Sequence, residues 1–296
     1  MTYNGEHSAK ADFLLLITTL LAAAGWIFSK EALAGLPPLL FIGTRFLAAS
    51  LLLCAFCIPQ LRAISRRELG GALVVGVLFS TSMALWIMGL AYCSHLGEGA
   101  FICSLGIVLV PVFARLFFHE RPPLSTWLAL PVSLAGFGFL SLERGFRVEV
   151  GQVFFLGSAL VVALMFNVNS RVVRKVPVLP LSAIQMLVVG LLVLPAGLVV
   201  EKWPDNIPAS VLGWLAASAF IATTLRFFLQ LYGQSLTMPS HAAIIMMLEP
   251  ALTAGAAAWW YGESMSAMQL TGCLLIFIAL IVSRWSWVRS LLKAFS

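Results

Sequence analysis

Residues 179–200 read LPLSAIQMLVVGLLVLPAGLVV, a run of 22 residues without a charged side chain. An α-helix needs roughly 20 apolar residues to cross the hydrocarbon core of a bilayer, so this run is long enough to span a membrane. Segment 171–175 (RVVRK) before the run is basic, whereas segment 201–205 (EKWPD) after it carries two acids and one lysine. The stretch therefore predicts a transmembrane helix with its basic flank at one face of the membrane.

The rest of the chain has the same character. Of its 296 residues 61% are hydrophobic and 10% are charged, whereas a soluble domain has about 25% charged residues. This composition excludes a soluble globular domain, a disordered chain, a collagen and a disulfide-stapled scaffold. We predict an all-α polytopic membrane protein with ten transmembrane helices. They fall near residues 12–30, 37–58, 70–93, 97–118, 124–142, 150–170, 179–200, 210–232, 239–261 and 266–286.

The distribution of Lys and Arg predicts the orientation. Twelve of the 18 fall on the side of the ten predicted helices that carries both termini, and four fall on the other side. Cytoplasmic loops are enriched in Lys and Arg, so we expect both termini in the cytoplasm. The net charge is +6, but the basic residues stand singly or in short groups between apolar runs. The lipid bilayer, and not a nucleic acid, is therefore the expected large partner.

An internal repeat divides the chain into residues 1–148 and 149–296. A shift of about 143 residues aligns Glu120 with Glu263, and each Glu follows a long apolar run that contains a proline. Small residues follow both acids at equal distances, which favours close helix packing: Ala129 and Gly136, Gly272 and Ala279. Five helices per half is an odd number, so the second half must be inverted, and the loop charges of the two halves are indeed reversed. Inverted repeats are typical of secondary transporters.

The motifs resemble those of a known family. The tripeptide 248–250 (LEP) with Gly262-Glu263, Gln269 and Gly272 resembles the closing motif of the EamA repeat, which defines many members of the drug/metabolite transporter superfamily. A weaker copy stands in the first half, and the opening of the repeat is also recognisable: Pro111, Glu120 and Gly136, then Gly25-Trp26, Pro37-Pro38 and Arg45-Phe46. The chain departs from the pattern because Ala129 and Ala279 replace expected glycines, and because the spacing from proline to glutamate is 9 residues in one half and 13 in the other.

Within the superfamily the chain is most similar to the YddG-type amino acid exporters. This resemblance implies two five-helix copies and a monomer that exports small metabolites across the bacterial inner membrane. The implied substrates are neutral or aromatic amino acids, carried by alternating access. No phosphate-binding loop is visible, so we expect no direct use of ATP.

Ionisable residues inside the predicted spans are costly in lipid, and such residues usually face a cavity or a partner. Arg226 is the candidate for binding a substrate carboxylate, since a guanidinium offers several donors in a fixed fork; it is equally a candidate partner for Glu249. Glu249 precedes a proline, and we favour a structural ion pair with Arg226 or Arg45 over protonation during transport. Glu98 and His241 correspond under the shift, and they are read either as gate or proton-linked groups or as solvated interfacial residues.

An aromatic substrate requires a mostly apolar site with a few polar groups. Residues of one helical face and of neighbouring spans are candidates for lining it: Trp26, Phe79, Ser82, Met83, Trp86, Phe101, Phe166 and Asn167. The alternative for each of them is packing against neighbouring helices or lipid. The glycine pairs at 70–71, 97–99 and 136–138 indicate close helix packing more than ligand binding.

Three functions compete. The first is the amino acid exporter described above. The second keeps the fold but exports drug-like cations or other metabolites, which would need an accessible carboxylate in the membrane. The third, which we disfavour, is an intramembrane enzyme acting on lipid-linked substrates, because the clustered carboxylates, nucleophile or metal ligands of such an enzyme are not visible. We expect no enzyme activity, no cofactor and no metal, since His95 and Glu98 are too few for a metal site.

Overall fold

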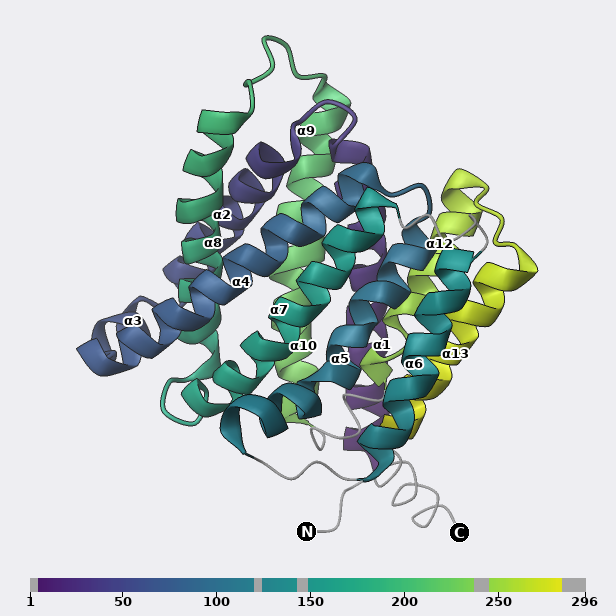
Figure 1. Ribbon diagram of the computed structural model, residues 1–296. Helices are drawn as coiled ribbons and strands as arrows, with labels where there is room; N and C mark the ends of the chain where they lie inside the picture. The colour runs from purple at the N-terminus through teal and green to yellow at the C-terminus, as the bar shows by residue number, and fades with distance from the viewer. Residues whose placement is uncertain (1–4, 120–123, 143–148, 237–244, 284–296) are drawn as a thin grey trace.

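The structure is a computed structural model that describes residues 5–119, 124–142, 149–236 and 245–283. The described residues contain helices and connecting turns and no strand. The helices, labelled in Figure 1, are α1 (Gly5–Ala32), α2 (Pro38–Phe56), α3 (Ile58–Ala63), α4 (Arg66–Tyr92), α5 (Leu96–Phe118), α6 (Leu124–Leu142), α7 (Val150–Val172), α8 (Val178–Val200), α9 (Ala209–Ala216), η1 (Ala217–Leu225), α10 (Arg226–Ser235), α12 (Glu249–Tyr261) and α13 (Ala267–Ser283).

Seven helical stretches are long and apolar enough to cross a membrane, and each coincides with a predicted span. The fifth and tenth predicted spans are present as shorter apolar helices, residues 127–140 and 267–282. The eighth is one helical stretch made of α9, η1 and α10, in which η1 is a nine-residue π-helix. The start of the ninth, residues 239–244, lies outside the described residues. The prediction of an all-helical, multi-pass membrane protein is confirmed.

The helix ends follow local sequence signals. Ser65 and Glu68 form a capping box at the start of α4, in which each side chain accepts a hydrogen bond from the other residue's backbone N–H. Glu149 and Gln152 form the same arrangement at the start of α7. Helix α12 ends at Tyr261, and Gly262 follows it with a φ of 66°, in the left-handed region that glycine adopts without strain. The helices therefore begin and end where the loops between predicted spans were placed.

The helices pack in matched sets. Three contacts, α2 with α8, α5 with α12 and α6 with α13, each pair one helix of residues 1–148 with one of residues 149–296. Helix α4 packs against α7, and α1 packs against the α9–η1–α10 stretch in the same way. In Figure 1 the α2–α8 pair stands at the left edge of the bundle and the α6–α13 pair at the right, with α1, α5, α7 and α10 between them.

Small residues hold these pairs close together. A Cβ added to Gly136 would come within 2.8 Å of the Gly272 carbonyl oxygen, and one on Gly272 would come within 2.7 Å of the Gly136 oxygen. Ala129 and Ala279 are fully buried in one cluster between the same two helices. The close packing predicted for these four residues is confirmed. A Cβ added to Gly138, the second glycine of the pair 136–138, would meet nothing within 4 Å. Close packing therefore applies to Gly136 and not to Gly138.

This difference gives a matched test of the α6–α13 contact. Gly136→Ala should lower the free energy of unfolding in detergent by about 1–3 kcal/mol, because the new methyl group meets backbone that cannot move aside. Gly138→Ala, two residues away, should leave it unchanged or slightly raised, since alanine is the better helix former. The thermal midpoints of the two purified variants provide the measurement. Equal midpoints would contradict the packing described above.

Candidate functional site

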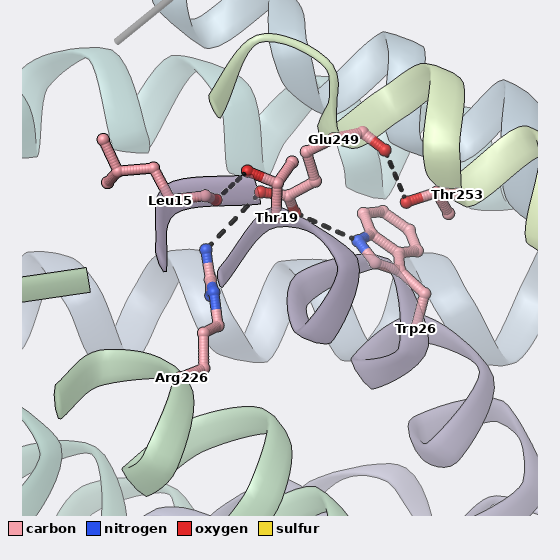
Figure 2. Close-up of polar contacts among 6 residues, drawn as sticks. All are labelled: Leu15, Thr19, Trp26, Arg226, Glu249 and Thr253. Atoms are coloured by element: carbon pink, nitrogen blue, oxygen red, sulfur yellow. Dashed lines mark hydrogen bonds and ion pairs between the residues drawn. The ribbon is translucent and has the colours of Figure 1, made fainter. Parts of the chain in front are cut away.

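A three-residue polar contact joins the two halves of the chain in the middle of the bundle (Figure 2). The Glu249 carboxylate lies between Arg226 and Trp26: Arg226 Nη2 is 3.4 Å from Glu249 Oε2, and Trp26 Nε1 donates to Glu249 Oε1 at 3.4 Å. The side chains of Arg226 and Glu249 are each 29% exposed. The ion pair that the sequence suggested for Glu249 is therefore present, with Arg226 and not Arg45 as the partner.

The local fold fixes where these groups stand. Arg226 follows directly after η1, and the wider π-helical turn is stabilised by Thr223 and Thr224, whose hydroxyls donate to carbonyls five residues earlier. Such π-helical segments are rare and occur often at functional sites. Glu249 begins α12, and Thr253 Oγ1 donates to its backbone carbonyl at 2.9 Å. Two helix junctions thus place the opposite charges side by side.

A second guanidinium, that of Arg45, is buried nearby and donates two hydrogen bonds. Its Nε donates to Thr223 Oγ1 at 2.8 Å, and its Nη1 donates to Ser29 Oγ at 2.9 Å. The group also lies over two rings, 5.5 Å from the centre of Phe46 and 6.0 Å from the centre of Trp86. Arg45 is 7% exposed and close enough to Arg226 for their charges to repel. Arg45 therefore ties α1, α2 and η1 together while it adds positive charge beside Arg226.

An aromatic cluster surrounds these charges. Trp26 meets the edge of Trp86 at a centroid distance of 5.0 Å and lies 5.6 Å from Phe155. Phe46 meets Phe79 edge to face at 5.4 Å. The five rings come from α1, α2, α4 and α7, so both halves of the chain contribute. Of the predicted lining residues, Trp26 contacts Glu249 and packs against Trp86, and Phe79 packs against Phe46 beneath Arg45.

The other predicted lining residues are spread more widely. Met83 and Phe101 pack in the same core as the aromatic cluster. Ser82 is buried and shares a 3.0 Å hydrogen bond with Ser158 of α7, which is a helix-packing contact. Asn167 donates to the backbone carbonyls of Val110 and Ala163. Phe166 is 49% exposed, and no described contact joins it to the cluster.

Of the two predicted gate residues, Glu98 lies in the described part of the chain. Glu98 is 3% exposed and accepts a hydrogen bond from Gln152 of α7, which is also 3% exposed. The reading of Glu98 as a solvated interfacial residue is therefore wrong, because the side chain is buried between helices of the two halves. A gate or proton-linked role remains a prediction. His241 lies outside the described residues.

Carboxylates close the end of the bundle that carries Lys30, which we call the Lys30 end. Both oxygens of Glu201 accept from the Leu39 and Leu40 N–H groups at the start of α2, at 3.0 and 2.9 Å. Both oxygens of Glu263 accept from the Leu96 N–H at the start of α5, at 3.1 Å. Each carboxylate comes from one half of the chain and satisfies a helix N-terminus of the other half.

Side chains of α1 and α12 complete this closure. Trp260 Nε1 donates to Glu31 Oε1 at 3.0 Å, and Trp260 also meets Trp214 edge to face at 5.9 Å. Lys30 Nζ donates to the Leu90 and Cys93 carbonyls at the end of α4. A pocket of about 700 Å³ remains at this end. Its lining includes Lys30, Glu31, Pro37, Pro204 and Tyr261.

Comparisons with known proteins bear on what this site does. The sequence profile of the EamA-like transporter family matches residues 9–142 and again residues 149–285. An uncharacterized transporter of Archaeoglobus fulgidus is 28% identical over 282 residues, covering 94% of this chain and 87% of the relative. The uncharacterized inner membrane transporter YedA of Escherichia coli is 26% identical over 229 residues, covering 73% and 68%. A solved structure described as "Crystal structure of protein" shares the fold, with a TM-score of 0.63 at 17% identity over 95% of this chain and 98% of that one.

Substitution of Glu201 tests whether its carboxylate stabilises the start of α2 at the Lys30 end. Glu201→Gln should lower the free energy of unfolding by about 1–2 kcal/mol, because one acceptor oxygen and the negative charge at the α2 N-terminus are lost. Asp205→Asn in the same loop is the control, and it should stay within about 0.5 kcal/mol of the parent. Thermal unfolding of both variants in detergent measures the difference. If the control variant were as unstable as Glu201→Gln, the loss of stability would come from the loop charge in general and not from the cap.

Proposed function

The chain belongs to the EamA-like transporter family, and from this premise we propose that it is a secondary transporter that exports neutral or aromatic amino acids across the bacterial inner membrane. The observation that carries the proposal is the long Arg226–Glu249 contact beside the aromatic cluster. A charge-assisted hydrogen bond in a committed ion pair is about 2.7–2.9 Å long, whereas this contact is 3.4 Å. The pair is therefore close enough to stabilise both charges and loose enough to be exchanged.

An amino acid matches this pair group by group. Its carboxylate suits Arg226, whose Nε is buried and has no hydrogen-bond partner among the described residues. Its ammonium group suits the Glu249 carboxylate. Its side chain meets the apolar surface that Trp26 and Trp86 provide. The substrate thus replaces one opposite-charge contact with two, which favours binding of a zwitterion over a simple anion or cation.

Alternating access is the mechanism we infer for this transport. The proposal takes the chain as ten spans in two inverted halves, residues 1–148 and 149–296, with both termini in the cytoplasm and the protein acting as a monomer. The two matches of the family profile, one in each half, support it. The matched helix contacts support it too, because exchanging each helix for its counterpart maps α4–α7 onto the contact of α1 with α9–η1–α10. In this view the Lys30 end is the outer face. It is closed by the Glu201 and Glu263 caps and by the contacts of Trp260 with Glu31 and Trp214.

Export of drug-like cations is the second candidate. Glu249 is the accessible carboxylate that this candidate needs, being 29% exposed. The Arg226 guanidinium lies 3.4 Å from it, however, and its positive charge disfavours a cation without a carboxylate of its own. The cation proposal expects Glu249→Gln and Glu98→Gln to keep amino acid uptake and lose cation efflux. That outcome would overturn the amino acid proposal.

Uptake into proteoliposomes tests the substrate class. Radiolabelled Phe, Trp, Met, Thr and Lys are offered to the purified protein, with and without an imposed pH gradient. We expect saturable uptake of Phe, Trp and Met, with Lys excluded because its second positive charge would face the two guanidinium groups. A dependence on the pH gradient would implicate the buried carboxylate Glu98 in coupling. Absence of uptake for every amino acid would contradict the proposed substrate class, but it would not affect the membership of the chain in the transporter family.

Substitution of Arg226 tests the residue assigned to the carboxylate. Arg226→Gln should raise the KM for Phe by tenfold or more, since one charge-assisted hydrogen bond is worth about 1.5–3 kcal/mol. Arg226→Lys should be intermediate because it keeps the charge and loses the fork. The exposed Arg62 of α3 supplies the control, and Arg62→Gln should transport as the parent does. An unchanged KM in Arg226→Gln would mean that Arg226 does not bind the substrate.

A further inference from the structure

A second, basic pocket lies at the opposite end of the bundle from Lys30. Its volume is about 520 Å³, and it stands between the first turns of α4 and the last turn of α7. Its lining residues are Ser65, Arg67, Glu68, Gly71, Arg171, Val172, Lys175 and Val176. One wall therefore belongs to residues 1–148 and the other to residues 149–296.

The charges of this pocket are unbalanced. Three cationic side chains, Arg67, Arg171 and Lys175, line it together with one carboxylate, that of Glu68. The Glu68 carboxylate is already occupied, because its Oε2 accepts from the Ser65 backbone N–H at 2.8 Å and from the Ser65 hydroxyl at 2.7 Å. The positive end of the α4 dipole and the negative end of the α7 dipole both lie here and offset each other, so the excess comes from the side chains. The pocket therefore attracts an anion.

Its three cations are held to different degrees. The Arg171 guanidinium is fixed, since Nη1 donates to the Asn167 carbonyl at 2.7 Å and the group lies 3.5 Å from the centre of the Phe118 ring. Arg67 and Lys175 are exposed, and within the described part of the chain neither side chain has a hydrogen bond or an ion pair. One preset cation with two adaptable cations beside it suits a phosphate group, whose oxygens accept from several directions.

Exposed apolar side chains lie on both walls beyond the pocket, farther along α4 and α7. Val74 lies one turn beyond Gly71 on the same face of α4 and is 54% exposed. Leu160 lies on the same face of α7 as Arg171, three turns nearer the centre, and is 40% exposed. In a membrane protein such surface contacts acyl chains. A free phosphate would use only the basic mouth of this arrangement, whereas a phospholipid would use both parts.

We propose that this pocket binds the headgroup of an anionic phospholipid, with the acyl chains along α4 and α7. Basic pockets between transmembrane helices on the cytoplasmic side are suited to such headgroups. Because the walls belong to different halves, a bound lipid links α4 to α7 and resists their separation. The site is independent of the transported substrate.

Thermal unfolding in a neutral detergent tests the proposal, with phosphatidylglycerol, phosphatidylcholine or inorganic phosphate added to the whole protein. We expect phosphatidylglycerol to raise the midpoint in a saturable way, and phosphatidylcholine and phosphate to have little effect. The double variant Arg67→Gln with Lys175→Gln should need at least fivefold more phosphatidylglycerol for half of the shift. The matched control is Arg66→Gln with Arg174→Gln, which removes the same charge from exposed neighbours outside the pocket, and it should respond as the parent does.

Three results would overturn the proposal. An equal loss in the control variant would mean that anionic lipid is attracted to the whole basic face and not to the pocket. An equal shift with phosphatidylcholine would remove the role of the headgroup charge, and an equal shift with phosphate alone would make this a free-anion site. Arg67→Lys with Lys175→Arg keeps both charges, so its recovery of the parent response would separate lost binding from lost folding in the glutamine variant.

Discussion

A charge placed in the low-dielectric interior of a membrane protein needs either an opposite charge or a full set of hydrogen bonds. Arg45 meets this requirement with hydroxyl groups and rings, and in the described part of the chain no carboxylate is paired with it. Arg226 meets it with Glu249, through a single long contact. Glu249 thus balances one of the two guanidinium groups, and Arg45 adds a second positive charge to this part of the bundle.

The sequence predicted those parts of this arrangement that depend on composition and local spacing. Runs of apolar residues predicted the helices, because only a helix satisfies its own backbone in lipid. The rarity of charge inside the runs identified Arg226 and Glu249, and the spacing of Phe79, Met83 and Trp86 on one face of α4 predicted part of the aromatic cluster. Each of these signals is contained in a single stretch of chain.

The parts that the sequence did not predict depend on contacts between distant stretches. Phe155 joins the aromatic cluster because Gly89 and Gly99 leave room for its ring. A Cβ added to either glycine would come within 2.7 or 2.4 Å of that ring. The two glycines indicate close packing, but the neighbouring sequence does not indicate which ring fills the space. The π-helix before Arg226 likewise has no signal in its own composition. The acids Glu201 and Glu263 appeared as loop charges and motif positions, whereas each caps a helix about 160 residues away along the chain.

The central site and the closure at the Lys30 end share two helices, and this links them mechanically. Trp26 and Glu31 belong to α1, while Glu249 and Trp260 belong to α12, so the Trp26–Glu249 and Glu31–Trp260 contacts join the same helices at two heights. A helix of 13 residues moves largely as one body. Under the proposed function, a substrate ammonium group that draws Glu249 away from Trp26 acts on the element that carries Trp260. Helices α1 and α12 carry both the groups that recognise the substrate and the groups that close one end of the bundle. Under the proposed alternating access, a movement at the first set of groups therefore reaches the second through these two helices directly.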